Sequence, residues 1–399
     1  METSCDFLIV GAGIVGLTVA FELKKRHKSS KIIILEKELQ VGIHASGRNS
    51  GVLHSGIYYG SDTLKARVCS AGGESMMEFA KEEKIDYAQD GKVILATSED
   101  QLSTIDKLLD NAKNNNIKAE RIDQQQLKEI EPFSANGPAA IYCPTTAVID
   151  SKKVVERLKE KLENDGVSFI FDAKAIRLID DNSIETTKGI VGFSFLYNCA
   201  GAYANTVSNL FGLASEYTLI PFKGIYWKLS DAANHKIKSS IYPVPDISLP
   251  FLGVHLTRVI GGEVYVGPTA IPVLGRENYS GYCGIKMHET FETILQLSKM
   301  YFQNEKGFRR MAHMELSKYR KINFLNEAQK LMPSLRAEDM VPTKKAGIRP
   351  QLVNKVTGEL EMDYILKSGR NSMHVLNAIS PAFTSSFEFA KMIISKSSV

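Results

Sequence analysis

The sequence predicts a mixed α/β protein, with α+β character, that opens with a Rossmann-like βαβ unit. Its first 36 residues contain a buried-type strand, a glycine turn, a helix and a second strand that ends in an acidic residue. A helical pattern from Lys152 to Leu162, followed by a strand that ends at Gly201, brings the chain back to this kind of unit. The stretch from Leu219 to Thr269 is rich in β-forming residues and indicates a second sheet.

The opening unit has the pattern of a dinucleotide-binding turn. Residues 7–10 form the strand, GAGIVG (residues 11–16) is a GxGxxG turn, a helical pattern covers 14–26, and the second strand, 32–35, ends at Glu36. Glycines allow the tight turn and the close approach of a pyrophosphate, the helix N-terminus offers free N–H groups, and the carboxylate can bind a ribose. The residues expected to contact the dinucleotide here are Gly11, Ala12, Gly13, Ile14, Val15, Gly16, Glu36 and Lys37.

NAD and FAD share this fingerprint, and two later segments favour FAD. YNCAG (residues 197–201) is a strand of the kind that brings a distant segment to the adenine side of an FAD domain. In the C-terminal run 375–396, a strand leads through Ser380 and Pro381 into a helix, with Pro381 at an early helical position. The N-terminus of that helix could face the pyrimidine edge of a flavin, where negative charge gathers on reduction. The alternative is a plain packing helix.

Composition limits the class of protein. The chain has 399 residues, of which 44% are hydrophobic and 24% charged, as in a folded soluble protein. The net charge is only +4 and basic residues are interleaved with acidic ones, so no nucleic-acid partner is expected. No run reaches the roughly 18 apolar residues of a spanning helix, and the first strand leaves no room for a targeting peptide. We expect a cytoplasmic protein, with peripheral contact at the inner face of a membrane left open.

The five cysteines point to neither zinc nor disulfides. Cys5, Cys69, Cys143, Cys199 and Cys283 stand singly, without CxxC or CxxH spacing. We expect reduced thiols and no metal site.

Several segments together resemble one known family. They are GAGIVG, NSGVLHSGIYY with SDTLKARVCSAG, PFKGIYW, IYPVPDISLPFLGVHLTR, VYVGPTA, AGIRPQ and NAISPAFTSS. The chain resembles the L-2-hydroxyglutarate oxidase/dehydrogenase family, a branch of the D-amino-acid-oxidase-like and glycine-oxidase-like FAD enzymes, from about residue 5 to residue 395. SGVLHSG and VGPTA also resemble the glycerol-3-phosphate oxidase branch, whereas the IYPVPDISLPFLGVHLTR segment is more specific.

The resemblance implies two interleaved domains. An FAD-binding domain would comprise 1–80, 151–214 and 334–399, and a substrate domain on a mixed, largely antiparallel sheet would comprise 81–150 and 215–333. FAD is expected to be noncovalent, because the Cys or His attachment positions of relatives find no match. The further residues expected at the cofactor are Ala45, Ser46, Ser50, Gly51, Val52, Ala175, Ala200, Gly201, Ser380, Pro381, Ala382 and Thr384.

The loop NSGVLHSGIYY, residues 49–59, carries the expected catalytic residue. Its glycines, hydroxyls and imidazole suit neither a fully buried strand nor a strand with alternating apolar residues. We therefore expect a loop that packs closely against another group. The resemblance places its histidine, His54, beside the flavin, where a neutral imidazole can accept the proton of a hydroxyl group. A structural histidine is the alternative. His44 is the nearest rival, but its position suggests the pyrophosphate side.

The implied substrate, L-2-hydroxyglutarate, carries two carboxylates that need cations or hydrogen-bond donors. Arg349 of AGIRPQ resembles the family arginine that reaches the substrate, and its planar group suits bidentate binding. Lys223, His255 and Lys65 are the further candidates, while the single Trp227 is expected in the core.

The resulting hypothesis is FAD-dependent oxidation of L-2-hydroxyglutarate to 2-oxoglutarate, with hydride transfer to flavin N5 and His54 as general base. The electron acceptor would be O2 or a quinone. Glycerol-3-phosphate oxidase and an amino-acid or amine oxidase are the alternatives within the superfamily. A flavin-binding protein that serves assembly or docking at a respiratory membrane is the alternative outside enzymes.

Overall fold

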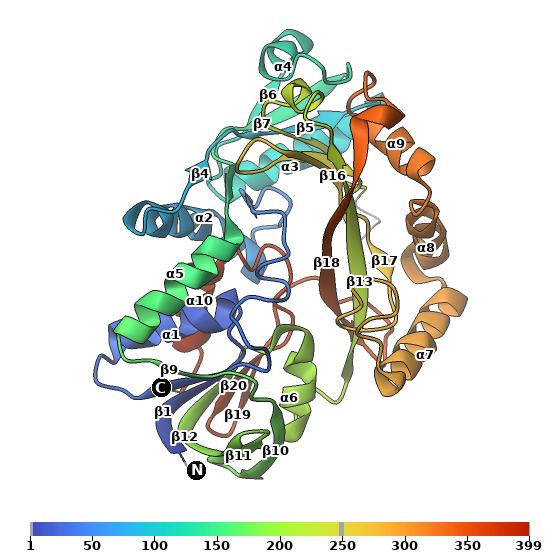
Figure 1. The fold of residues 1–399 in the computed structure, drawn as a ribbon. Coiled ribbons are helices and arrows are strands. Elements are labelled where there is room, and N and C mark those ends of the chain that lie inside the picture. The colour runs from blue at the N-terminus through green and yellow to red at the C-terminus, as the bar shows by residue number, and fades with distance from the viewer. Residues whose placement is uncertain (1–2, 247–250, 399) are drawn as a thin grey trace.

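A computed structural model of the chain describes residues 3–246 and 251–398. Figure 1 shows two main sheets, one below that carries both chain ends and one above it with helices along its outer side. The chain passes between the two sheets several times. The mixed α/β fold predicted from the sequence is therefore confirmed.

The first sheet has eight strands, and its centre is parallel. The order is β10, β11, β12, β1, β2, β9, with β20 beside β12 and β19 beside β20. Strands β1, β2, β9, β12 and β20 run parallel, whereas β10, β11 and β19 add antiparallel pairs at the margins. The strands are β1 (Thr3–Val10), β2 (Ile32–Leu35), β9 (Ser168–Ile170), β10 (Ala175–Asp180), β11 (Ser183–Thr186), β12 (Gly189–Asn198), β19 (Leu366–Gly369) and β20 (Ser372–Val375).

Helices cover both faces of this sheet. On one face α1, α2, α5 and α10 pack into a core that includes Phe7, Ile9 and Ile34. On the other face α6 packs through Val207 against a core with Leu8. The helices are α1 (Ile14–Arg26), α2 (Leu64–Glu82), α5 (Ser151–Asn164), α6 (Ala204–Leu210) and α10 (Ser386–Ser395). A parallel strand between two helix layers is buried on both sides, which explains why β1 and β2 consist of apolar runs.

The second sheet has nine strands and is largely antiparallel. Its order is β17, β13, β16, β15, β14, β5, β7, β6, with β18 also paired to β13, and among the described strands of this sheet only β14 and β5 pair in parallel. The long β13 and β18 run antiparallel over most of their length. The strands are β5 (Lys92–Ala96), β6 (Glu120–Ile122), β7 (Ala139–Cys143), β13 (Tyr217–Leu229), β14 (Ser240–Pro243), β15 (His255–Arg258), β16 (Val264–Gly267), β17 (Ile271–Pro272) and β18 (Met340–Asn354).

The strand β18 moves one predicted domain boundary. The sequence assigned 334–399 to the FAD-binding domain, but 340–354 pairs with β13 and so lies in the second sheet. The chain rejoins the first sheet only at β19. Residue 349, in this segment, is therefore positioned by the second sheet. Trp227 of β13 packs against the core of the same sheet, as expected.

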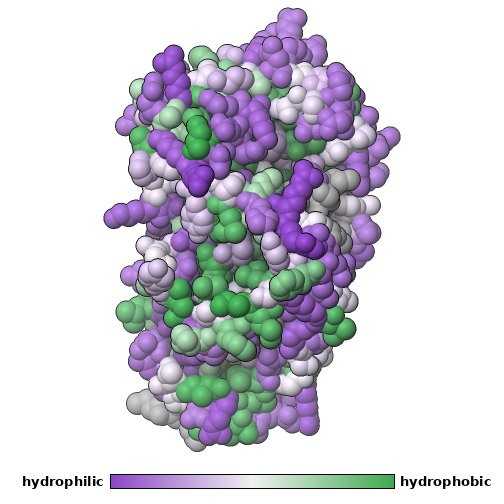
Figure 2. All heavy atoms as spheres, turned by 90° about the vertical axis from the view of Figure 1, so that its right-hand side faces the viewer, coloured by the Kyte–Doolittle hydropathy of each residue, from purple (hydrophilic) through white to green (hydrophobic). Residues whose placement is uncertain are grey.

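Five of the described helices cover the second sheet, and α7 leaves the largest group of apolar side chains exposed. They are α3 (Leu102–Asn114), α4 (Gln124–Ile130), α7 (Met287–Gln303), α8 (Phe308–Ser317) and α9 (Lys321–Gln329). Figure 1 shows α7, α8 and α9 stacked along the outer side of β13 and β18. Figure 2 looks onto this side, where green apolar side chains gather in the lower half. In the described ranges no helix has the length and apolarity to cross a membrane.

A small three-stranded sheet joins the two halves of the molecule. It consists of β3 (Val52–Leu53), β8 (Ala147–Ile149) and β4 (Tyr87–Ala88), in the order β3, β8, β4. Gly51, directly before β3, has a φ of +76°, and a Cβ there would lie 2.6 Å from the carbonyl oxygen of Ile149. The pairing of β3 with β8 fixes the position of the next residue, His54.

Candidate functional site

A cavity of about 420 Å³ lies where the two sheets meet. Its walls come from the glycine turn after β1, the end of β2, the loop 42–54, the segment 199–207, the strands β13, β15 and β18, and the turn 378–384. The first sheet contributes the carboxyl ends of parallel strands, the usual position of a ligand in an open α/β sheet. The cavity therefore brings together segments that are far apart in the sequence.

The glycine turn has the shape that a dinucleotide requires. Gly11 has a φ of +107°, and a Cβ at this position would lie 2.6 Å from the carbonyl oxygen of Cys199. A Cβ on Gly16 would lie 2.0 Å from the carbonyl oxygen of Gly11, so only glycine lets α1 start this close to β1. No acidic residue stands in the first turn of α1, so the positive end of its dipole is available to phosphate. The cradle fits a pyrophosphate.

The Glu36 carboxylate holds this turn in place at the end of β2. It is 9% exposed, and its Oε2 accepts a hydrogen bond from the Ala12 N–H at 2.8 Å. Its Oε1 accepts from the N–H of Glu38 at 2.9 Å. The carboxylate also lines the cavity, so the group expected at the ribose is already oriented by two backbone donors.

The structure brings most of the predicted cofactor residues to the wall of the cavity. Ser46 is tied to the start of α1, because its Oγ accepts from the N–H of Ile14 at 2.9 Å. Ala12, Gly16 and Gly51 do not line the cavity and instead shape the backbone behind it. The predicted residues that line it are Gly11, Gly13, Ile14, Val15, Glu36, Lys37, Ala45, Ser46, Ser50, Val52, Ala175, Ala200, Gly201, Ser380, Pro381, Ala382 and Thr384.

The C-terminal segment forms a turn rather than the predicted helix start. Residues 380–385 are turns, and α10 begins at Ser386 instead of at Pro381. The Thr384 hydroxyl is engaged by the loop with His54: its Oγ1 accepts from the His54 N–H at 3.1 Å and donates to the Val52 carbonyl at 3.3 Å. These contacts place the turn 380–384, and not a helix N-terminus, against the cavity.

His54 lies in the cavity with a neutral imidazole. Desolvation, followed by the positive charges of Lys92, His255 and Arg349, lowers the pKa of His54 to about 3. Its backbone is held at N–H by Thr384 and at the carbonyl by the Cys69 thiol. No side chain of the described residues hydrogen-bonds to its ring, so both ring nitrogens remain free for a ligand.

His255 is a second neutral imidazole in the cavity wall. Burial lowers its pKa to about 4, against the opposing effect of the Gly253 carbonyl. Its Nδ1 lies 2.9 Å from that carbonyl oxygen and must donate to it, which leaves Nε2 as the acceptor. Its ring stacks on Tyr242 with centroids 4.0 Å apart. The histidine is thus oriented more rigidly than His54.

Arg349 of β18 brings an unpaired cation to the same cavity. Within the described ranges no carboxylate or hydrogen-bond acceptor meets its guanidinium group, whose carbon lies 5.0 Å from the ring centroid of Phe251. Desolvation lowers its pKa, while Tyr59 and Tyr226 act in the opposite direction. An interior cation without a counterion is costly unless an anionic ligand binds to it. This end of the cavity is therefore suited to a carboxylate.

Two predicted substrate residues do not reach the cavity. On β13 the alternate residues Phe222, Gly224 and Tyr226 line it, so Lys223 between the first two points to the other face of the strand. The Lys65 ammonium of α2 donates a hydrogen bond to the carbonyl oxygen of Met362, and burial, followed by the charge of Arg349, lowers the pKa of Lys65 to about 7. It is a neighbour of the cavity wall and not part of it.

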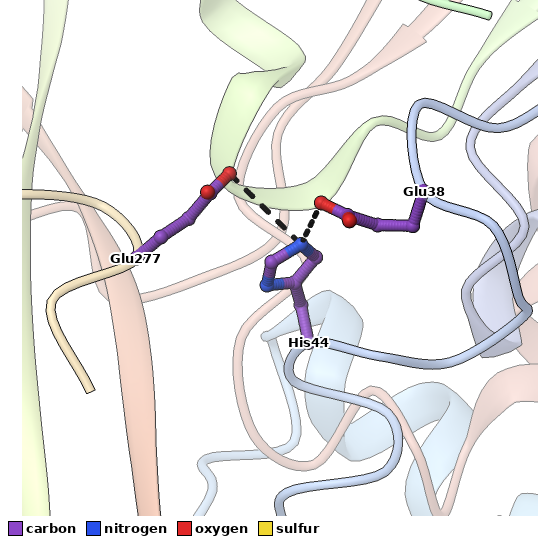
Figure 3. Close-up of side chains that lie close together, drawn as sticks. All are labelled: Glu38, His44 and Glu277. Carbon is purple, nitrogen blue, oxygen red and sulfur yellow. Dashed lines mark hydrogen bonds and ion pairs between the residues drawn. The ribbon is translucent and has the colours of Figure 1, made fainter. Parts of the chain in front are cut away.

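A charged cluster that the sequence did not reveal lies at another part of the wall (Figure 3). Glu38 and Glu277 both point at Nε2 of His44, at 2.8 Å and 3.9 Å. These three groups are close enough to hold a cation, but the Lys37 ammonium already bonds to both carboxylates. Tyr279 hydrogen-bonds to Nδ1 of His44. Because Glu277 comes from the second sheet's part of the chain, the cluster ties the cofactor loop to that half.

Comparisons with known proteins agree with this geometry. Residues 6–395 match the FAD dependent oxidoreductase family. A protein of Indibacter alkaliphilus named L-2-hydroxyglutarate dehydrogenase is 36% identical over 95% of both chains, and the mitochondrial protein of that name from Caenorhabditis elegans is 35% identical over 98% of this chain and 92% of its own. Among solved structures, the L-alpha-glycerophosphate oxidase of Mycoplasma pneumoniae with FAD bound has the same fold, with a TM-score of 0.77 at 19% identity over 98% of this chain and 94% of the other. The chain is therefore an FAD-dependent enzyme and belongs to the L-2-hydroxyglutarate dehydrogenase family of FAD-dependent oxidoreductases.

Proposed function

We propose that this enzyme oxidises L-2-hydroxyglutarate to 2-oxoglutarate with noncovalently held FAD. The observation that carries the proposal is Arg349, a cation that meets no acceptor among the described residues and lies in the same cavity as the neutral imidazole of His54. A 2-hydroxy acid presents a carboxylate next to the carbon that is oxidised, so one substrate can meet both groups. The names of the relatives at 35% and 36% identity supply the particular hydroxy acid.

In this proposal some residues bind the substrate and the cofactor, and His54 transfers the proton. FAD held in this cavity would supply the oxidant for the hydride that leaves C2 of the substrate. Arg349 binds a carboxylate through its planar donor pair and so orients the substrate. His54 accepts the hydroxyl proton on a ring nitrogen as the C–O bond becomes a carbonyl. The turn at Gly11 and the carboxylate of Glu36 bind the dinucleotide portion.

We expect anaerobic L-2-hydroxyglutarate to bleach the visible flavin absorbance of the purified enzyme, and acid to release the flavin into solution. D-2-hydroxyglutarate serves as the matched control, because it has the same charges and opposite handedness at C2. The measurement is the absorbance change with each compound in a sealed cuvette. Bleaching by glycerol 3-phosphate or an amino acid instead would favour the alternative activities, and no bleaching by any of them would favour a docking protein. Flavin that stays with the denatured chain would contradict noncovalent binding.

We further propose that the outer face of α7 contacts an anionic membrane surface, as a route for electrons to a quinone. Met287, Phe291 and Leu295 recur every four residues, so they share one side of the helix, and they are 84%, 70% and 63% exposed. Phe302, at the end of α7, is 78% exposed. Large apolar side chains grouped in this way on a surface mark an interaction site.

Charge favours a lipid surface as the occupant of this face. The exposed cations Lys286, Arg309 and Arg310 lie before α7 and at the start of α8, where they can meet phosphate head groups. Lys286 also lines the cavity, so the face lies close to the flavin site. Apolar side chains beside cations are the pattern of an interfacial helix.

We expect the native enzyme to sediment with vesicles of phosphatidylglycerol and phosphatidylcholine, and to do so less with pure phosphatidylcholine. The double variant Phe291→Glu with Leu295→Glu should lose at least tenfold in vesicle affinity, because each glutamate replaces apolar contact with charge. The control is Phe133→Glu with Ile176→Glu, which alters exposed apolar residues elsewhere. Equal loss in both double variants, or dimerisation through α7 without vesicle binding, would contradict the proposal.

A further inference from the structure

Lys92, the first residue of β5, is a fully buried lysine without a polar partner. Its side chain has an exposed fraction of 0%, and its Nζ finds no hydrogen-bond or ion-pair partner among the described residues. The Nζ lies 4.7 Å from the ring centroid of Tyr58 and 5.1 Å from that of Tyr242. A buried ammonium or amine group is normally paired with a polar partner. An unpaired lysine does not stabilise the fold, so its presence here calls for another explanation.

In the part of the chain that the structure describes, the surroundings of Lys92 contain aromatic rings and thiols but no counterion. Desolvation lowers its pKa, and the groups that oppose this are the thiols of Cys143 and Cys69. The buried hydroxyls of Tyr58 and Tyr242 also find no hydrogen-bond partner among residues 3–246 and 251–398. Ring faces stabilise a desolvated cation far less than a carboxylate at contact distance does. An apolar side chain would therefore suit this position better.

Tyr242 connects Lys92 to the imidazoles of the cavity. Its ring contacts the Lys92 amine on β5 and stacks at 4.0 Å on His255 of β15. Tyr242, His255 and His54 line the cavity, whereas Lys92 lies outside its wall. The amine is thus shielded from substrate and cofactor and can influence the reaction only through these neighbours.

The groups that act on the two imidazoles come from three strands and are all basic. Lys92 of β5, His255 of β15 and Arg349 of β18 face His54, and each disfavours a proton on its ring. Lys92 likewise faces His255, whose Nδ1 is bound to a backbone carbonyl. A proton on one member of this group therefore opposes a proton on the others, because like charges repel strongly inside a protein.

We propose that Lys92 is a positioning residue whose buried side-chain cation adds to the effect of burial in keeping the imidazoles of His54 and His255 neutral and so ready to accept the substrate's proton. This inference rests on the proposed role of His54 as the base. Bound dicarboxylate favours protonation of the imidazoles, since an opposite charge stabilises the charged ring. Lys92 opposes this protonation from outside the cavity wall, so it takes up none of the space that the substrate occupies.

The test is the pH dependence of anaerobic flavin reduction at saturating L-2-hydroxyglutarate in Lys92→Met. Methionine keeps the length of the side chain and removes the charge, so the acid limb should move to higher pH by on the order of one unit. The melting temperature should stay equal or rise, because an unpaired buried polar group is replaced by an apolar one. NMR titration of the His54 ring in the same holoenzyme, without turnover, should show that Lys92→Met shifts the His54 pKa in the same direction, to a higher value.

Tyr58→Phe is the matched control, because it removes a hydroxyl from the same buried group and keeps both the ring and the charge. It should leave the acid limb in place. Should Lys92→Met fold poorly, Tyr58→Leu removes one of the two supporting rings and should move the limb in the same direction by less. An unmoved limb in the folded Lys92 variant, or an equal shift in Tyr58→Phe, would overturn the inference. An acid limb that persists in His54→Ala would instead overturn the proposed base.

Discussion

His54→Ala is expected to slow anaerobic flavin reduction by about a hundredfold to ten-thousandfold, the range for removal of a general base. The ring lies in the cavity, has no partner among the described side chains and is neutral, so it is free to accept the hydroxyl proton. FAD should remain bound, because the cofactor residues around Gly11 and Glu36 are untouched. Stopped-flow measurement of flavin absorbance separates this chemical step from binding.

The pH profile of the native enzyme tests the same assignment. Because a lowered pKa keeps the imidazole unprotonated, reduction should stay level from pH 8 to well below the ordinary imidazole pKa of about 6.5. It should fall only as the pH drops through the lowered value, where the protonated ring can no longer accept a proton. The small residual rate of His54→Ala should lack that fall.

His255 is the informative rival to His54. Its Nδ1 donates to the Gly253 carbonyl, so its Nε2 is an acceptor in a fixed orientation within the same cavity. His255→Ala should weaken substrate binding and leave most of the reduction rate. If His255→Ala instead shows the large loss while His54→Ala reduces its flavin at the native rate, the base is His255 and His54 is a packing residue.

The parts of the fold that sequence could predict are those with local causes. Apolar runs, the glycine turn and helical spacing predicted β1, α1 and β2, and the structure has α1 at Ile14–Arg26 as expected. The roles of Gly11 and Gly16 could be predicted from the sequence because no other residue fits the turn. Thr384 was expected at the cofactor from the resemblance, although its contact with the His54 loop depends on residues 330 positions apart.

The parts that sequence could not predict depend on register and on long-range packing. Lys223 and Phe222 are neighbours on β13, and only the pairing with β18 decides which one faces the cavity. Nothing local indicates that Glu277 reaches Lys37, 240 positions away. Lys92 looks like any charged residue at the start of a strand, and its burial follows from β7 and β14 on either side.

Arg349→Lys is expected to lower kcat/KM for L-2-hydroxyglutarate by about tenfold or more, and Arg349→Ala by about a hundredfold or more. Lysine keeps the charge but cannot offer the two parallel donors that fit a carboxylate, so orientation suffers more than attraction. Alanine removes both, and truncating one partner of an enclosed charge pair costs several kcal/mol. Steady-state kinetics with a dye acceptor gives the ratio, and guanidinium chloride added to Arg349→Ala should restore part of the rate.

The control for Arg349 lies on the paired strand. Lys223→Ala removes a cation from β13 only one register position away, opposite Ile348, but from the face that points away from the cavity. If attraction by any nearby positive charge were sufficient, both alanine variants would lose activity to a similar extent. If Arg349 binds the carboxylate directly, only the Arg349 variants lose activity, and only Arg349→Ala regains activity when guanidinium chloride is added. Normal kcat/KM in Arg349→Ala would place the carboxylate elsewhere in the cavity, because no binding partner of a dianion can be removed without cost.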